Sequence, residues 1–295
     1  MAKVFRDDQR LFLKKMLSQQ TVKRKTDQRD EWIPEETGLR MPVKKSKTTT
    51  NSVDKPSRSA KLAESSRKRL SMSHFRSMNE TLYTTSAGEA SMLMDSDSFT
   101  KYHEAYRGIA EKWPVKPIDF IITKIRKMLG KELKNKAVLT DMGCGDKPLL
   151  AEAFPSLTVH SFDLVSTDER ISPSSLDRIP LKNQSVDVVV YSLSLMAADL
   201  SLVMKEASRI VKTGGHVIIA EVASRFEADS STDSLKSFVE KLDKFFGLSL
   251  KLTDKLQPNN FFLVFDFVKE KDTRRHATND VLPRLSLKAC QYKPR

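Results

Sequence analysis

The chain has 295 residues, of which 39% are hydrophobic and 30% charged, and its formal net charge is +13. No apolar run approaches the length of a membrane span, and two cysteines, Cys144 and Cys290, argue against a disulfide scaffold or a cysteine-rich metal site. We therefore expect a soluble intracellular protein with no membrane or metal partner. Residues 1–70 hold 19 Lys and Arg against 9 Asp and Glu, so the basic excess lies mainly there. Such a segment favours nucleic-acid binding or a nuclear address over a merely solvated tail.

The composition divides the chain into three parts. Residues 1–57 are predicted to be a disordered basic arm, because they carry too little apolar surface to offset chain entropy. Residues 58–98 are predicted to be a helical extension with a loose apolar stripe beside the cations at 67–69. This extension either packs on the domain or presents cations to RNA phosphates, and both can hold because the two faces differ. Residues 99–295 are expected to form the main domain.

An aromatic-rich segment opens the main domain. It contains His103 and ends near Pro114, and Pro117 opens a segment whose apolar period predicts a helix over 118–129. From the residues alone, His103 is best interpreted as a half-buried histidine whose ring is satisfied by its neighbours.

A short apolar strand over 138–141 ends in an acid and then in Gly143-x-Gly145. Glycine tolerates positive φ, so two glycines permit a tight turn and let a ligand lie against bare backbone. A second short strand, 159–163, ends in Asp163, where an acid is placed to accept hydrogen bonds from ribose hydroxyls. The alternative is two buried strands with capping acids.

The spacing of these motifs differs from the dinucleotide fingerprint, whose third glycine is replaced here by Pro148. Asp-x-Gly-x-Gly with an acid at the end of the next strand is similar to the pattern of class I S-adenosylmethionine-dependent methyltransferases. Further strands are predicted over 186–195, 216–222, 248–252 and 261–268, and further helices near 148–154 and over 199–211 and 234–246. This alternation predicts an α/β fold with a parallel, Rossmann-like sheet. Because only a loop, 254–260, joins the last two strands, the last should be antiparallel and near the edge.

Over residues 67–295 the chain resembles the ribosomal RNA-processing protein 8 family. The motifs that carry this resemblance lie at 75–83, 102–114, 143–146, 161–164, 192–196, 220–226, 261–267 and 287–293. Ser-Leu-Ser-Leu-Met at 192–196 and Ala-Glu-Val-x-Ser-Arg-Phe at 220–226 are typical of this family rather than of the fold in general.

The resemblance implies a nucleolar methyltransferase that uses S-adenosyl-L-methionine to methylate N1 of an adenine in large-subunit rRNA. It also implies links to a silencing complex on ribosomal DNA chromatin. The positions that match the family's cofactor contacts, together with the second glycine of the turn, are His103, Gly143, Gly145, Asp163, Ser175, Leu176 and Ser192. Ser175-Leu176 falls where the family has Asp-Met, and Ser192 falls where it usually has cysteine.

Three polar residues are candidates to stabilise the cationic methylated base: Ser194, Asp199 and Glu221. Ala197-Ala198-Asp199 replaces the family's usual Gly-Thr-Asn, and Ser175 lacks the family's carboxylate. These departures favour cofactor binding over turnover and sustain an alternative, a non-catalytic cofactor-binding scaffold in rRNA processing or rDNA silencing. A methyltransferase acting on small molecules or proteins is a weaker hypothesis, because neither the basic arm nor the motifs favour it.

Overall fold

The computed structural model describes residues 58–131, 133, 136–227, 229, 232–257, 260–270 and 282–290. The chain divides into two compact units, residues 1–66 and 67–295. The predicted basic arm over 1–57 lies outside the described residues. The second unit contains the sheet, the helices that cover it and every residue of the candidate site.

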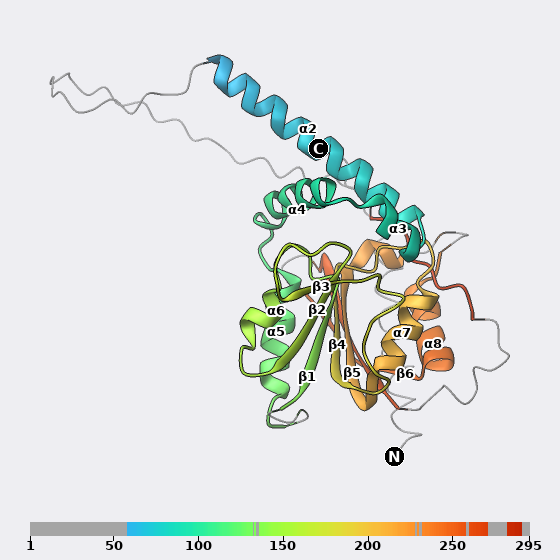
Figure 1. The fold of residues 1–295 in the computed structure, drawn as a ribbon. Coiled ribbons are helices and arrows are strands. Elements are labelled where there is room, and N and C mark those ends of the chain that lie inside the picture. Colours follow the sequence, from blue (N-terminus) through green and yellow to red (C-terminus); the bar gives the residue numbers. More distant parts are fainter. Residues whose placement is uncertain are drawn as a thin grey trace, which may run out of the picture. The chain divides into compact units, whose positions relative to one another are not determined.

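The second unit is built on a seven-stranded sheet with the strand order β3-β2-β1-β4-β5-β7-β6 (Figure 1). The strands are β1 (Val138–Met142), β2 (Thr158–Asp163), β3 (Ile171–Pro173), β4 (Val186–Ser192), β5 (Val211–Val222), β6 (Leu248–Lys255) and β7 (Phe262–Lys269). Strands β1 to β5 pair in parallel, whereas β7 is antiparallel to both β5 and β6. The predicted α/β fold and the antiparallel last strand are therefore confirmed.

Several strand boundaries differ from the sequence-based expectation, most notably those of β4 and β5. Strand β4 ends at Ser192 rather than at residue 195, because Leu193 turns into the left-handed region with φ +59°. Its N–H still donates to the Ala220 oxygen at 3.0 Å, so the loop stays attached to β5. Strand β5 begins at Val211, directly after a helix, and the glycines expected to separate the two elements lie inside it. The short strand β3 was not predicted.

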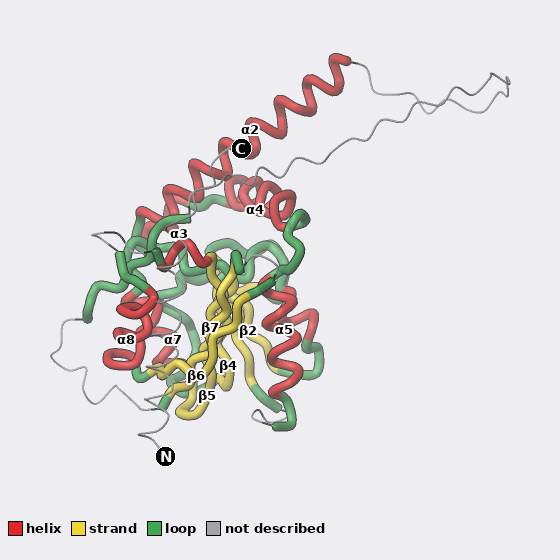
Figure 2. The backbone as a smooth tube through the Cα atoms, turned by 180° about the vertical axis from the view of Figure 1, so that it is seen from behind, coloured by secondary structure: helices red, strands yellow, loops and turns green. Residues whose placement is uncertain are grey.

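Helices cover both faces of the sheet, α5 (Pro117–Met128) and α6 (Leu149–Ala153) on one side and α7 (Ser201–Ile210) and α8 (Leu235–Phe246) on the other (Figures 1 and 2). The boundaries of α8 follow its caps. The Ser234 side chain accepts the Ser237 N–H, and Gly247 ends the helix with φ +66°. The apolar face of α5 packs with β1, β4 and β5 into one buried cluster.

Three helices precede the sheet: α2 (Arg58–Thr84), α3 (Ala87–Leu93) and α4 (Ser96–Ala110). From Arg67 onward they belong to the same compact unit as the sheet, and α4 runs across residue 98, where the sequence suggested a boundary. Phe75 of α2 stacks on Tyr102 of α4 with ring centroids 4.9 Å apart, inside a second apolar cluster. Among the described residues, none of these or the other helices combines the length and apolarity that a membrane span needs.

The described residues 282–290 return to the body of the unit. The Lys288 N–H donates to the Arg225 oxygen at 3.1 Å, and the Leu200 N–H donates to the Leu285 oxygen at 2.7 Å. The buried Asn79 amide of α2 donates to the Cys290 oxygen at 3.0 Å. This segment therefore ties α2, the start of α7 and the 3-10 turn η2 (Ala223–Phe226) together.

Candidate active site

A cavity of about 400 Å³ opens at the carboxyl ends of β1, β2 and β4, beneath α3 and α4. In open α/β sheets this edge, where the strand order reverses between β1 and β4, is where ligands bind. Its volume lies in the usual range for a small-molecule or cofactor site. The predicted site residues on its wall are His103, Gly143, Gly145, Asp163, Leu176, Ser192 and Ser194.

The turn after β1 forms the floor of this cavity. Gly143 and Gly145 have φ values of +78° and +75°, which side chains disfavour. The turn is held by the N–H groups of Gly143 and Cys144, which both donate to the Phe162 oxygen, at 2.8 and 3.0 Å. A Cβ on Gly143 would lie 2.5 Å from the Cβ of Ser194, so this position has no room for a side chain.

Asp163 ends β2 beside this turn. Its two carboxylate oxygens accept the N–H groups of Gly145 and Leu164, each at 2.7 Å. Each oxygen keeps a further lone pair, so the group can still accept hydrogen bonds from a pair of hydroxyls. Burial raises the pKa of Asp163 to about 6, although the two N–H donors oppose that rise.

A second acid, Asp141 at the end of β1, lines the same cavity. It is 2% exposed, and its Oδ1 atom has no hydrogen-bond partner among the described residues. Burial, and secondarily the charge of Asp163, raise the pKa of Asp141 to about 7. Burying a carboxyl oxygen without a hydrogen bond costs free energy of folding. Such an oxygen therefore suits a ligand that brings a hydrogen-bond donor or a positive charge.

His103 reaches the turn from α4. A Cβ on Gly145 would lie 3.1 Å from the His103 ring, so the imidazole sits directly on the glycine backbone. The ring packs against Phe99, with centroids 4.3 Å apart. Burial, and secondarily the charge of Arg107, lower the pKa of His103 to about 4, so the ring is neutral at pH 7. The histidine is thus both half-buried among aromatic rings and part of the cavity wall.

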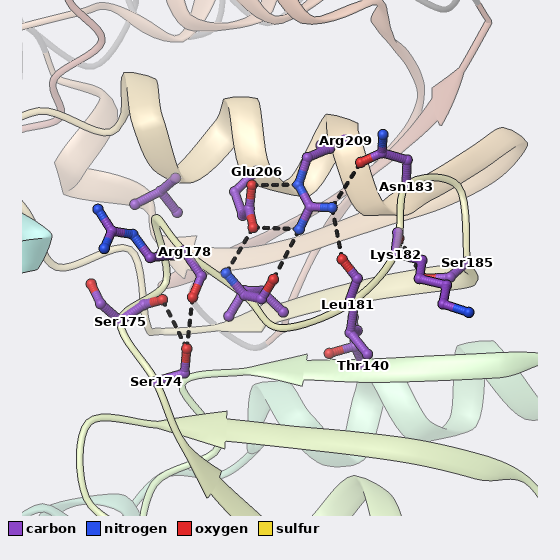
Figure 3. Close-up of polar contacts among 12 residues, drawn as sticks. Thr140, Ser174, Ser175, Arg178, Leu181, Lys182, Asn183, Ser185, Glu206 and Arg209 are labelled. Carbon is purple, nitrogen blue, oxygen red and sulfur yellow. Dashed lines mark hydrogen bonds and ion pairs between the residues drawn. The ribbon is translucent and has the colours of Figure 1, made fainter.

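The loop after β3 separates the two residues predicted there. Leu176 lies on the cavity wall, whereas the Ser175 hydroxyl donates to the Asp177 carboxylate at 2.5 Å and is not among the lining residues. Helix α7 holds this loop through Arg209, which donates to the Leu181 oxygen at 2.7 Å (Figure 3). Arg209 also donates to the Ile179 oxygen at 2.9 Å.

The last residue of β4, Ser192, and the loop after it, with Ser194, line the cavity. The Ser194 hydroxyl donates to the Met142 oxygen, which attaches this loop to the end of β1. The structure does not bring the other two catalytic candidates to the cavity wall. Asp199 accepts hydrogen bonds from Ser201 and from the Leu285 N–H, at the start of α7. Glu221 is 1% exposed and accepts the Leu195 N–H at 3.3 Å, so its carboxylate lies behind the loop.

Sequence reasoning did not select Asp141 or Arg107 as site residues. Arg107 of α4 lines the cavity and forms an ion pair with Asp146, the residue that follows the second glycine of the turn. The position of Asp141 directly before the glycines was a usable signal. For Arg107 the sequence offered no signal beyond its position four residues after His103, on the same face of one helix.

The sheet order, the glycine turn and the acid that ends β2 are those of a class I methyltransferase, and the cofactor of this class is S-adenosyl-L-methionine. The donors and acceptors fit that cofactor, since Asp163 can take the ribose hydroxyls and Asp141 offers a buried acceptor to a positive charge. The family model described as "Hypothetical methyltransferase" matches residues 61–295. With the relatives described next, this match shows that the chain belongs to the ribosomal RNA-processing protein 8 family.

Three curated relatives illustrate this membership. Ribosomal RNA-processing protein 8 of Dictyostelium discoideum is 31% identical over 300 residues, which cover 95% of this chain and 72% of that protein. The 25S rRNA (adenine(645)-N(1))-methyltransferase of Schizosaccharomyces pombe is 35% identical, with 87% and 81% coverage. Ribosomal RNA-processing protein 8 of Mus musculus is also 35% identical, but this chain spans only 49% of its length.

Proposed function

We propose that this chain transfers a methyl group from S-adenosyl-L-methionine to N1 of an adenine in large-subunit rRNA, during ribosome biogenesis in the nucleolus. The observation that carries this proposal is the cavity itself, with its glycine floor and the two acids, Asp141 and Asp163. The adenine N1 specificity is supported by the name of the Schizosaccharomyces pombe relative, of which this chain covers 81%.

The chemistry asks little of the protein beyond orientation. When bound, S-adenosyl-L-methionine supplies a methyl group on a positively charged sulfur. Adenine N1 has a free lone pair at neutral pH, so no strong general base is needed. Holding donor and acceptor in line is an orientation effect that can contribute up to about 7–11 kcal/mol. The rigid turn at Gly143 and the attached loop at Ser194 are suited to that task.

The methylated adenine carries a positive charge, which nearby acceptors would stabilise. Of the three catalytic candidates predicted from the sequence, Ser194 lies on the cavity wall. Its hydroxyl donates to the Met142 oxygen, and the hydroxyl oxygen can still accept a hydrogen bond. We infer that Glu221 acts at one remove, by fixing the Leu195 N–H, and that Asp199 acts by accepting the N–H of Ser201, the first residue of α7. Ser175 is not on the cavity wall, so of this pair only Leu176 is placed to contact the cofactor's adenine.

N1 lies on the pairing edge of adenine, so the target base must be unpaired or extruded from its helix. The basic excess of residues 1–70 would supply affinity for surrounding phosphates, independent of sequence. Ribosomal RNA or a pre-ribosomal particle is therefore the proposed partner. A role with silencing-complex proteins on ribosomal DNA chromatin stays a proposal that rests on the family resemblance.

The competing proposal is a cofactor-binding scaffold that does not turn over. Ala197 favours it, because this residue lines the cavity, is 3% exposed and offers no polar side-chain atom. The two proposals predict different behaviour for a variant that folds but binds no cofactor.

The test uses cells that lack this protein. An N1-methyladenine stop in reverse transcription of large-subunit rRNA should disappear in the knockout and return with the wild-type gene. It should not return with Gly143→Arg, whose side chain would fill the cofactor space. Gly108→Arg is the matched control, because a Cβ at Gly108 meets nothing within 4 Å.

A second variant guards against misfolding of Gly143→Arg. Asp163→Asn should weaken cofactor binding by about 1.5–3 kcal/mol, the contribution of a charged hydrogen bond. The N1-methyladenine stop in the rRNA should weaken accordingly. If both variants, expressed at equal level, fully restored the N1-methyladenine stop, the scaffold proposal would replace the enzyme proposal.

A further inference from the structure

The mouth of the cavity carries an ion pair whose role is separate from the acids on the floor. Arg107 of α4 contacts the Asp146 carboxylate through Nη1, and the side chains are 36% and 21% exposed. Both residues line the cavity. The other cations on the wall, Lys116 and Lys147, are exposed at the rim. Arg107 is therefore the most enclosed cation among the described lining residues.

The position of Arg107 is set by the helix that carries it. Residues four apart share a helix face, so Arg107 lies on the face of α4 that places His103 against Gly145. The guanidinium thus lies over the same turn, beside the residue that follows Gly145. Asp146 shows that a carboxylate fits against the guanidinium here.

The cavity wall carries four acids and three cations. S-adenosyl-L-methionine carries a sulfonium, an ammonium and one carboxylate, and of these groups the carboxylate needs a cation as its partner. Of the three cations, Arg107 is the least exposed. Partly exposed ion pairs contribute little to stability, so Arg107 can exchange Asp146 for a ligand carboxylate at small cost. A guanidinium binds a carboxylate through two parallel hydrogen bonds, which a lysine cannot reproduce.

We propose that Arg107 binds the carboxylate of the amino-acid part of the cofactor, in the place that the Asp146 carboxylate occupies in this structure. This inference rests on the proposed use of S-adenosyl-L-methionine. It makes α4 a direct contributor to cofactor selection, because nucleosides without the amino-acid carboxylate would not reach the arginine.

The test is a double-mutant cycle between protein and ligand, measured by calorimetry on the full chain. The ligands are S-adenosylhomocysteine and its decarboxylated analogue, 5′-deoxy-5′-(3-aminopropylthio)adenosine, which lacks only the carboxylate. Arg107→Met should weaken S-adenosylhomocysteine by about tenfold or more, the scale of a charged, two-point contact. The same variant should bind the analogue within about twofold of wild type. The affinity of Arg107→Lys for S-adenosylhomocysteine should lie between those of wild type and Arg107→Met, because lysine keeps the charge but cannot form two parallel hydrogen bonds.

The matched control is Arg170→Met, which removes another ion-paired arginine outside the cavity wall and should leave both affinities unchanged. Equal weakening of both ligands by Arg107→Met would assign the residue a structural role and overturn the proposal. Unchanged binding of both ligands would also overturn it. Wild-type protein that binds neither ligand would instead defeat the cofactor assignment itself, which separates the two failures. If Arg107→Met does not fold, Arg107→Lys alone must discriminate the ligands less than wild type does.

Discussion

The Glu221 carboxylate lies 2.8 Å from the Arg225 guanidinium, and the two side chains are 1% and 0% exposed. The Tyr83 ring of α2 lies over the guanidinium, 4.6 Å from centroid to Cζ. Glu221 also accepts the Leu195 N–H, so the pair supports the loop that carries Ser194. A buried ion pair therefore connects α2 to the back of the candidate site.

Removing one partner of this pair should be much more harmful than removing both. Arg225→Met leaves the Glu221 charge buried without its partner, which should lower the free energy of unfolding by about 3–5 kcal/mol. The double variant Glu221→Gln/Arg225→Met should recover part of that loss. Urea denaturation at pH 7 measures both. A single variant as stable as wild type would show that the pair carries no stability.

Cofactor affinity should fall as the pH falls from 8 to 6. Burial raises the pKa of Asp141 to about 7 and that of Asp163 to about 6, so both carboxyls take up protons over this range. A ligand that needs both ionised should lose about twentyfold in affinity, about tenfold from Asp141 and about twofold from Asp163. Calorimetry with S-adenosylhomocysteine measures the profile.

Two variants assign this pH dependence. Asp141→Asn should bind more weakly at pH 8 and lose most of the dependence between pH 8 and 6.5. Asp168→Asn should leave the wild-type profile intact, because Arg170 holds the pKa of partly exposed Asp168 at about 2, far below this range. A flat wild-type profile would contradict the proposed role of the two acids.

The clamp between α7 and the loop after β3 should control cofactor affinity from outside the cavity. Arg209→Met removes the hydrogen bonds to the Ile179 and Leu181 oxygens and frees the loop that presents Leu176 (Figure 3). We expect a loss of about 2 kcal/mol in unfolding free energy and weaker binding of S-adenosylhomocysteine. Arg178→Met, on an exposed arginine of the same loop, is the control. Full affinity in folded Arg209→Met would mean that the loop is held in place without the clamp.

RNA affinity should depend on the basic arm over 1–57. Phosphate contacts release counterions in proportion to their number, so deletion of the arm should flatten the slope of log affinity against log salt concentration. Filter binding of an rRNA fragment at several salt concentrations measures that slope, and circular dichroism checks that the sheet persists. An unchanged slope would place the RNA contacts in residues 58–295.

The sequence predicted the elements whose pattern is local and missed relationships that need distant segments. Gly143 and Asp163 were found because glycine freedom and an acid at a strand end are visible along the chain. Asp199 was selected for its chemistry, yet its bond to the Leu285 N–H depends on where residues 282–290 return. The end of β4 and the start of β5 were misplaced because tertiary pairing, such as that between Leu193 and Ala220, overrides local pattern.

The position of β7 bears on how the chain matures during synthesis. Strand β7 is the last in sequence but lies between β5 and β6, and Cys290 is buried in the same core as β1. Until the ribosome has released these residues, β5 and β6 each expose an unpaired edge, and such edges favour wrong association. The nascent protein should therefore acquire its native sheet only after β7 has left the ribosome, and cofactor capture should follow that step.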